Sequence, residues 1–538
     1  MIQASDLFVD CLVAHGVTTI FAVPGEENLD LVESIRKSSI KMIITRNEQT
    51  AVFMAATRGR LTGKVGVALA TLWPWATNMV TGVAHAQLAG VPILVITGQK
   101  PIKISKQGGF QIIDVVGMMQ PITKRATSIV DIQRIPATIA QARTLAETER
   151  PGAVHIELPE DIARETTDKM SCPVMPQSIR RPIIDEKMLK LLKTTLEQAK
   201  RPLILIGAGA NRKRITNYLT KFIQKTNIPF FTSQMGKGVV DESLPQYLGT
   251  WALTSWDGLH KIIDQADCVL AVGYDVVEKP ATIVDRCNTT LIHINFSPAQ
   301  VDQTYQPTLQ VIGDIWSTFW QLYESTLDTS HRDFTQMYTD AQAYHADMKQ
   351  KTETELAQST VWLRALAHIL RQHLWAQDVL ALDNGLYKLW LTRNFPAYSA
   401  NTFLVDNALA TMGAWVSIGM ATRLLDKEHE VICVVWDGGL MMNLGDLQTA
   451  VALGGPLTIV LLNDNAYGMI KRKQQAMGLE EFGLDLTNPD FSILAKAFGV
   501  DYQLADSPTK LQEALKKTHM QPGVHLIEVP IVYPVEVN

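Results

Sequence analysis

Two aspartates in the last third of the sequence each follow a run of apolar residues. Asp437 lies in the segment VVWDGGLMMN, and Asp464 follows 27 residues later in LLNDNAYGMIK. This spacing fits one strand–helix–strand crossover and predicts that both carboxylates emerge at the same edge of a parallel sheet. Hard oxygen ligands of this kind suit Mg²⁺, which also binds the phosphates of a ligand. Taken alone, the pair fits helix-capping turn residues equally well.

Glycines follow the first of these aspartates. Gly438 and Gly439 would let the backbone approach a diphosphate at the start of the next helix. Trp436 stands directly before Asp437, where such a turn leaves little room for an indole. The motif therefore predicts a metal and phosphate site with an unusual neighbour.

A second group of candidates lies near the start of the chain. Glu48 follows a predicted buried strand and begins a helix, where a glutamate is more often a stabilising helix-terminal charge than a functional group. The strand end in FAVPGEENLDL is equally ambiguous alone. The segment LILIGAGANRK, residues 203–213, lacks the full spacing of a dinucleotide loop, so a tight strand–helix turn is the better interpretation and nothing else favours flavin.

Composition excludes several classes of protein. The 538 residues are 46% apolar and 19% charged, with a net charge of −5 and an isoelectric point near 6.2. Basic residues are dispersed, so neither nucleic acid nor a membrane surface is expected as a partner. No leader or membrane-spanning run is apparent, and the five cysteines form no CxxC pair. These features favour a cytoplasmic protein that acts on small molecules.

Short β-branched runs alternate with longer helical patterns along the whole chain. Two polar, proline-rich or helix-prone segments interrupt this rhythm, near residues 167–186 and 343–359. The pattern predicts an α/β protein of three doubly wound parallel-sheet domains. We expect these domains to span residues 1–170, 185–340 and 358–538.

Motifs spread over nearly the whole chain resemble those of the acetolactate synthase group of thiamine-diphosphate-dependent enzymes. They are FAVPGEENLDL, RNEQTAVFMAATRGRLTGK, FQIIDVV, RPGAVHIELPEDIA, MGKGVVDE, WDGG and NDNAYGMIK. The resemblance implies a pyrimidine-binding domain, a central domain and a diphosphate-binding domain. It also implies thiamine diphosphate and Mg²⁺ as cofactors, and a homodimer or homotetramer with active sites between subunits.

The resemblance assigns a role to each matching residue. Glu48 would hydrogen-bond the aminopyrimidine ring and promote removal of the thiazolium proton. Asp437, Asp464 and the Ala466 carbonyl would bind the metal. The remaining cofactor neighbours would be Val23, Pro24, Gly25, Met412, Gly438 and Gly439, with Gln111 and Lys237 towards the substrate. The implied activity is decarboxylation of pyruvate, or a related 2-oxo acid, and its carboligation to acetolactate.

Tryptophans depart from this pattern at four positions. Trp73, Trp75, Trp415 and Trp436, four of the eleven tryptophans, stand where the family usually has glycine. An indole buries about 150–250 Å² and cannot share space with a diphosphate or thiazolium ring. We therefore expect these side chains to block the cofactor cleft and abolish or weaken thiamine diphosphate binding. The alternative function is a cofactor-free homologue that catalyses different chemistry on a small oxo or hydroxy acid, or a non-catalytic partner.

Overall fold

The structure is a computed structural model that describes residues 1–103, 109–168, 172–179, 181–251, 258–278, 289–301, 305–357 and 362–533. The chain divides into two compact units. The first comprises residues 1–180, 416–426 and 443–453, and the second comprises 181–415, 427–442 and 454–538. In the described part of the chain, no helix is both long enough and apolar enough to cross a membrane.

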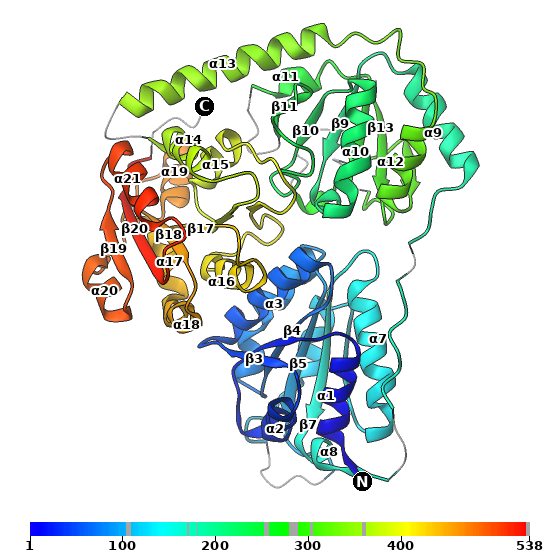
Figure 1. The fold of residues 1–538 in the computed structure, drawn as a ribbon, viewed down its shortest axis with the longest axis vertical. Helices are drawn as coiled ribbons and strands as arrows, with labels where there is room; N and C mark the ends of the chain where they lie inside the picture. The colour runs from blue at the N-terminus through cyan, green and yellow to red at the C-terminus, as the bar shows by residue number, and fades with distance from the viewer. Residues whose placement is uncertain are drawn as a thin grey trace. The chain divides into compact units, whose positions relative to one another are not determined.

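The first unit is built on a six-stranded sheet, drawn in blue to cyan in Figure 1, in which every pairing is parallel. Its strand order is β3-β2-β4-β5-β7-β6. The strands are β2 (Thr19–Ala22), β3 (Lys41–Ile44), β4 (Gly66–Ala70), β5 (Ile93–Gln99), β6 (Arg125–Ser128) and β7 (Ala153–Pro159). A separate antiparallel pair joins β1 (Ile2–Gln3) to β8 (Thr166–Thr167).

Alternating strand residues explain the layers of this unit. Ile20, Val67 and Leu94 share one apolar cluster with residues of α1 (Ala4–Ala14) and α7 (Ile135–Glu147). Neighbouring strand residues point to the opposite face. The remaining helices are α2 (Leu29–Lys37), α3 (Glu48–Thr62), α4 (Trp75–Asn78), α5 (Val80–Leu88), α6 (Val115–Met119) and α8 (Glu160–Arg164).

The second unit contains two further parallel sheets of six strands. One has the order β11-β10-β9-β12-β13-β14. Its strands are β9 (Pro202–Ile206), β10 (Phe230–Thr232), β11 (Tyr247–Thr250), β12 (Cys268–Val272), β13 (Thr290–Asn295) and β14 (Leu309–Ile312). Its helices are α9 (Glu186–Gln198), α10 (Lys213–Thr226), α11 (His260–Ile263) and α12 (Ile315–Glu324), and α13 (Thr335–Ala357) follows it in the chain.

The other sheet of the second unit has the order β16-β15-β17-β18-β20-β19 and is drawn in yellow to red in Figure 1. Its strands are β15 (Val379–Leu382), β16 (Phe403–Leu404), β17 (Val431–Trp436), β18 (Leu457–Asn463), β19 (Asp501–Leu504) and β20 (Val524–Pro530). The helices of this part of the sequence are α14 (Leu363–His373), α15 (Lys388–Asn394), α16 (Trp415–Leu425), α17 (Asp437–Met442), α18 (Leu447–Leu453), α19 (Gly468–Ala476), α20 (Phe491–Phe498) and α21 (Pro508–Thr518).

The three parallel sheets confirm the predicted α/β fold class. The strand order reverses direction between β2 and β4 in the first sheet, between β9 and β12 in the second, and between β15 and β17 in the third. Ligands of such sheets bind in the crevice at the carboxyl ends of the strands beside this switch point. The topology therefore predicts that ligand-binding residues follow β2, β4, β15 and β17.

Candidate functional site

Three neighbouring strands of the last sheet each end in an aspartate. Asp383 follows β15, Asp437 follows β17 and Asp464 follows β18. Because β17 pairs with both other strands in parallel register, the three residues lie at one edge of the sheet. The crossover spacing predicted this arrangement for Asp437 and Asp464.

The carboxyl groups of Asp437 and Asp464 lie next to each other. Their side chains are hydrogen-bonded to each other, and Asp437 is fully buried. Burial and the charge of Asp437 raise the pKa of Asp464 to about 7. Burial also raises the pKa of Asp437, against hydrogen bonds from Asn488 and the backbone. Two acids held this closely share a proton or bind a cation, so the donors fit a divalent metal ion.

Asn488, which the sequence did not indicate, lies at the same point. Its Nδ2 donates to Asp437 Oδ2 at 2.6 Å, to Asn465 Oδ1 at 3.0 Å and to Asn463 Oδ1 at 3.3 Å. Oxygens from three positions thus converge on one donor group, as they would on a cation. The predicted backbone ligand, the carbonyl of Ala466, accepts the N–H of Gly468 at 3.0 Å, and its role at a metal stays a prediction.

The raised pKa of Asp464 gives the first testable prediction. A carboxyl group with a raised folded-state pKa stabilises the fold below about pH 4, and this contribution is lost as the pH rises through about 7. Saturating Mg²⁺ is therefore expected to raise the melting temperature more at about pH 8 than at about pH 5. An excess of about 100 times Kd adds about 2.7 kcal/mol, and each kcal/mol is worth about 2–4 °C.

Differential scanning fluorimetry with and without MgCl₂ at the two pH values measures this effect. The control is Asp464→Asn, which removes the titrating partner and is expected to abolish the pH dependence of the Mg²⁺ shift. An equal Mg²⁺ shift at both pH values in the wild-type protein would show that the pair does not bind the ion.

The glycine turn beside Asp437 is covered by an indole. A Cβ atom on Gly438 would lie 2.3 Å from the six-membered ring of Trp436, and one on Gly439 would lie 2.7 Å from Trp436 Nε1. Trp436 is only 5% exposed and packs edge-on against Tyr467. Trp436 Nε1 has no hydrogen-bond partner among the described residues. The glycines therefore accommodate the indole that precedes them.

The other three tryptophans differ in environment. Trp415 is fully buried, and its Nε1 donates to the carbonyl of Gly439 at 3.1 Å, so it supports the same turn from within the core. Trp73 is 40% exposed and Trp75 is half-buried at the start of α4. Trp415 and Trp436, which both belong to the second unit, thus contact the glycine turn.

Asp383 is a further acidic residue that sequence reasoning missed. It is buried and accepts hydrogen bonds from the N–H groups of Gly413 and Ala414 at 3.1 and 3.2 Å. Burial raises the pKa of Asp383 to about 7. A Cβ on Gly439 would lie 2.1 Å from Asp383 Oδ2, so the carboxyl group touches the glycine turn. Its signal was available, since the segment ALDNG also places an aspartate and a glycine after an apolar run.

In the first unit, Glu48 begins α3 as predicted and is 4% exposed. Its Oε2 accepts a hydrogen bond from Asn78 Nδ2 at 2.8 Å. Asn47 caps the helix by accepting the N–H of Gln49, which fixes the direction of the helix start. The buried Glu48 carboxylate is therefore held by the side-chain amide of Asn78. It lies shortly after the end of β3 in the chain.

The strand ends at the switch point of the first sheet carry a network that the sequence did not indicate. Lys100 Nζ lies 2.6 Å from Glu27 Oε1, and Thr71 Oγ1 donates to Glu27 Oε2 at 2.8 Å. Burial opposes ionisation of Glu27, but the bonds from Lys100 and Thr71 leave its pKa below the usual value. The predicted cofactor neighbours Val23, Pro24 and Gly25 lie beside it, and a Cβ on Gly25 would clash with Thr71 at 2.4 Å.

The predicted substrate-side residues Gln111 and Lys237 and the predicted cofactor neighbour Met412 lie in different surroundings. Gln111 is half-buried with a positive φ of 54°, and Met412 is 40% exposed. Lys237 is fully buried, with its Nζ 2.7 Å from Glu242 Oε2 and 3.0 Å from Thr250 Oγ1. Burial lowers the pKa of Lys237. Its ammonium group is thus enclosed by two partners, and contact with a substrate stays a prediction.

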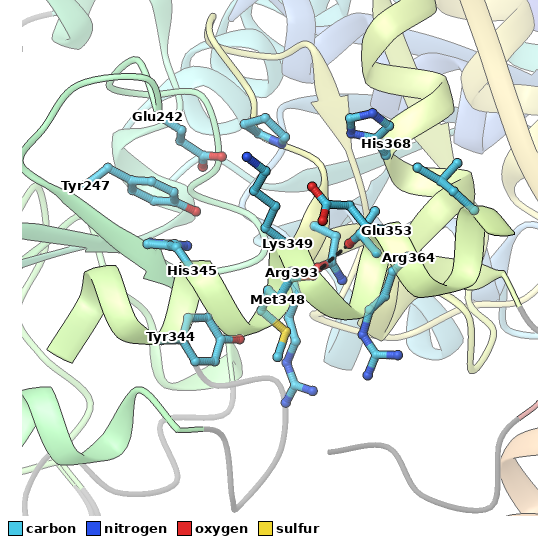
Figure 2. Close-up of a pocket in the computed structure, with 14 residues that line it drawn as sticks. Glu242, Tyr247, Tyr344, His345, Met348, Lys349, Glu353, Arg364, His368 and Arg393 are labelled. Atoms are coloured by element: carbon cyan, nitrogen blue, oxygen red, sulfur yellow. Dashed lines mark hydrogen bonds between the residues drawn. The ribbon is translucent and has the colours of Figure 1, made fainter.

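A cavity of about 680 Å³ lies beside Glu242. Figure 2 shows Tyr247 close to the α13 residue His345 on one side of it, and Glu353 and Arg364 on the other. None of the predicted catalytic, cofactor or metal residues lines this cavity, although Glu242, the partner of Lys237, does. We therefore do not assign it to the candidate site.

The weak glycine-rich turn after β9 holds its own acid. Glu278 Oε1 accepts the N–H of Ala208 at 2.9 Å, and burial raises the pKa of Glu278 to about 7. A Cβ on Gly207 would lie 2.5 Å from the Tyr274 backbone. These contacts agree with the tight strand–helix turn favoured by the sequence, because a protein carboxyl group uses the backbone donor that a dinucleotide phosphate would need.

Three family models match successive parts of the chain. Residues 2–118 match the N-terminal TPP-binding domain of thiamine pyrophosphate enzymes, residues 189–322 match their central domain, and residues 383–529 match their C-terminal TPP-binding domain. Thiamine pyrophosphate is another name for thiamine diphosphate. The matched segments contain most strands of the three sheets, the Glu48 region and the Asp437–Asp464 pair, whereas β6, β7 and β15 lie outside them.

Similar curated proteins match over nearly their full length. The acetolactate synthase of Bacillus subtilis is 28% identical, and the match covers 100% of this chain and 94% of the relative. The catabolic acetolactate synthase of Raoultella terrigena is 27% identical over 99% and 95% of the two chains. The large subunit of acetolactate synthase isozyme 2 of Escherichia coli is 26% identical over 97% and 94%.

Proposed function

Because the chain belongs to the acetolactate synthase group of thiamine pyrophosphate enzymes, we propose that it decarboxylates pyruvate or a related 2-oxo acid and joins the product to a second 2-oxo acid. The expected product from pyruvate is acetolactate, with release of CO₂. The observation that carries this proposal is the position of Asp437 and Asp464 at the ends of adjacent parallel strands, since two carboxyl groups held there suit a cation that would anchor a diphosphate.

The proposed role of each residue follows from its chemistry. Asp437 and Asp464 hold the metal ion, and Asn488 fixes the orientation of Asp437. Glu48 is buried and ionisable, so it can hold and transfer a proton at its Oε atoms. When bound, thiamine diphosphate supplies the electron sink for loss of CO₂. The protein positions the reacting groups and excludes water.

Trp436 leads us to propose that the wild-type protein binds this cofactor weakly. The indole covers Gly438 and Gly439, and an incoming diphosphate would have to displace it. Trp415 is buried in the core, and its Nε1 donates to the carbonyl of Gly439. It therefore cannot move away without disrupting the packing of the domain. The cation ligands therefore fit the cofactor, whereas the adjoining turn opposes it in this conformation.

Trp436→Gly is accordingly expected to tighten binding of thiamine diphosphate about 10- to 100-fold, which corresponds to relief of about 1–3 kcal/mol of steric conflict. Isothermal titration calorimetry in the presence of Mg²⁺ measures the affinity. The matched control is Trp436→Phe, which keeps an aromatic ring over the turn and should stay close to wild type. If the glycine variant folds and binds no more tightly than the phenylalanine variant, Trp436 is not the obstacle.

The same contacts favour a second candidate function, that of a cofactor-free homologue. If the indole excludes the diphosphate completely, the acidic groups Asp383, Asp437 and Asp464 remain at the ends of their strands beside the glycine turn. Such a protein would catalyse different chemistry on a small oxo or hydroxy acid, or act as a non-catalytic partner. Progress curves for pyruvate without added cofactor distinguish these two outcomes.

A direct assay tests the main proposal. Purified protein is incubated with pyruvate, Mg²⁺ and increasing thiamine diphosphate, and acetolactate and CO₂ are quantified. Cofactor-dependent product supports the 2-oxo acid carboligase, whereas pyruvate consumption that ignores the cofactor supports the second candidate. We further propose a cytoplasmic homodimer or homotetramer with active sites between subunits, which size-exclusion chromatography with light scattering tests.

A further inference from the structure

A second group of metal-type ligands lies at the amino end of β17, away from the aspartates. Glu430 directly precedes this strand, whereas Asp437 directly follows it. A strand rises about 3.3 Å per residue, so the two acids are separated by about 20 Å. Two histidines meet Glu430 there: His373 is the last residue of α14, and His519 directly follows α21.

The three side chains converge on one point. His373 Nε2 lies 2.9 Å from Glu430 Oε2, and His519 Nδ1 lies 2.7 Å from the same oxygen. One ligand atom from each residue lies within 4.8 Å of the other two, and the imidazole rings stand nearly perpendicular at 88°. Ligands about 2.0–2.2 Å from a tetrahedral ion are about 3.3 Å apart. A small movement of each side chain therefore admits an ion between them.

Glu430 carries an unsatisfied acceptor at this point. Its side chain is 4% exposed, and its Oε1 is buried without a hydrogen-bond partner among the residues that the structure describes. Its backbone is fixed, because its N–H donates to Asp378 Oδ1 at 2.8 Å. A buried carboxylate with one unused oxygen is well placed to bind a cation.

We propose that His373, Glu430 and His519 bind one divalent transition-metal ion, with Zn²⁺ the best match. Two imidazoles and one carboxylate suit zinc, whereas Mg²⁺ prefers oxygen ligands alone. His519 is 45% exposed, so water can reach the fourth position of the ion. The ion would join α14, β17 and α21, which are far apart in the sequence, and would stabilise the domain that carries Asp437.

Metal titration of the full-length protein tests this site. Metal-free protein is dialysed against Zn²⁺ in the presence of saturating Mg²⁺, which occupies the oxygen ligands of Asp437 and Asp464. We expect one Zn²⁺ per chain that Mg²⁺ does not displace. His519→Asn, at a half-exposed position outside a helix, is expected to weaken Zn²⁺ binding at least about 100-fold, because even outer-shell partners alone change metal affinity about 10- to 100-fold.

Two matched variants make the test specific. His368→Asn removes a histidine of the same helix as His373, whose ring bonds Gln372 and lies outside the proposed site, and this variant should bind Zn²⁺ like wild type. Asp464→Asn should also leave Zn²⁺ binding unchanged, which separates this site from the proposed catalytic one. Co²⁺ in place of Zn²⁺ should give the intense visible absorption of a tetrahedral ion in wild type and lose it in His519→Asn.

Two results would overturn the proposal. One is the absence of saturable Zn²⁺ binding in the wild-type protein, which would mean that the three residues form a hydrogen-bonded ion pair only. The other is unchanged Zn²⁺ affinity in His519→Asn, which would place the bound ion elsewhere.

Discussion

Replacing Glu48 with glutamine is expected to lower the rate of the cofactor-dependent reaction about 100- to 10,000-fold. Glu48 is buried at the start of α3, and its Oε2 accepts the amide of Asn78. Glutamine has nearly the same shape and keeps an oxygen for Asn78, but it neither accepts nor releases a proton at that position. The loss should therefore appear in kcat, measured by product formation at saturating cofactor and substrate.

The control for this prediction is Glu33→Gln, which neutralises an exposed glutamate paired with Arg36 in the same unit and should leave kcat unchanged. Asn78→Ala is expected to fall between the two, because it removes the partner of Glu48 and leaves its carboxylate in place. A rate in Glu48→Gln within about threefold of wild type would remove Glu48 from the proposed proton transfer.

Replacing Asp437 with asparagine is expected to weaken Mg²⁺-dependent binding of thiamine diphosphate more than about 100-fold. Loss of outer-shell partners alone costs about 10- to 100-fold in metal affinity, and Asp437 is proposed as a direct ligand. The same change removes the repulsion that raises the pKa of Asp464. The metal-free variant should therefore melt at a higher temperature than metal-free wild type at about pH 8, although it binds the cofactor less well.

These opposite effects on stability and binding separate a metal ligand from a residue that only supports the fold. Calorimetric titration gives the affinity, and scanning fluorimetry gives the melting temperature. Asp506→Asn is the control, because this exposed residue pairs with Lys510 on the surface of the same unit. A variant of Asp437 that destabilises the metal-free protein and keeps its cofactor affinity would contradict the assignment.

The proximity of Asp437 and Asp464 at the edge of the last sheet could be predicted because it depends on the order of neighbouring strands and the length of one crossover. Asp437 and Asp464 end adjacent parallel strands, and one crossover of ordinary length fixes their proximity. The same rule would have found Asp383, which ends the strand on the other side of β17. It was missed because a single aspartate after a short apolar run is a weak signal without a known partner.

The directions of the tryptophan side chains could not be predicted in this way. The sequence places an indole where the family resemblance leads us to expect glycine, but the rotamer of that indole depends on the packing around it. Trp415 is buried in the core and Trp436 lies back over its own turn, while Trp73 is exposed in the other unit. Blocking of the cofactor cleft by the four tryptophans stays a prediction, and Trp436 is the side chain that lies against the glycines of its own motif.

Contacts between residues that are far apart in the sequence also could not be predicted from the spacing of motifs. The Glu27–Lys100 ion pair joins the ends of two strands of the first sheet, and neither residue stands out in its own motif. His373, Glu430 and His519 come from two helix ends and a strand start. No local pattern marks such residues, because only the assembled sheet brings them together.

The measurement that tests the central claim most directly is acetolactate formation from pyruvate as thiamine diphosphate is raised at saturating Mg²⁺. We expect a rate that rises with cofactor and saturates, with half-saturation at a lower concentration in Trp436→Gly than in wild type. Production of no acetolactate at any cofactor concentration by either protein, both shown to be folded, would contradict the proposed activity.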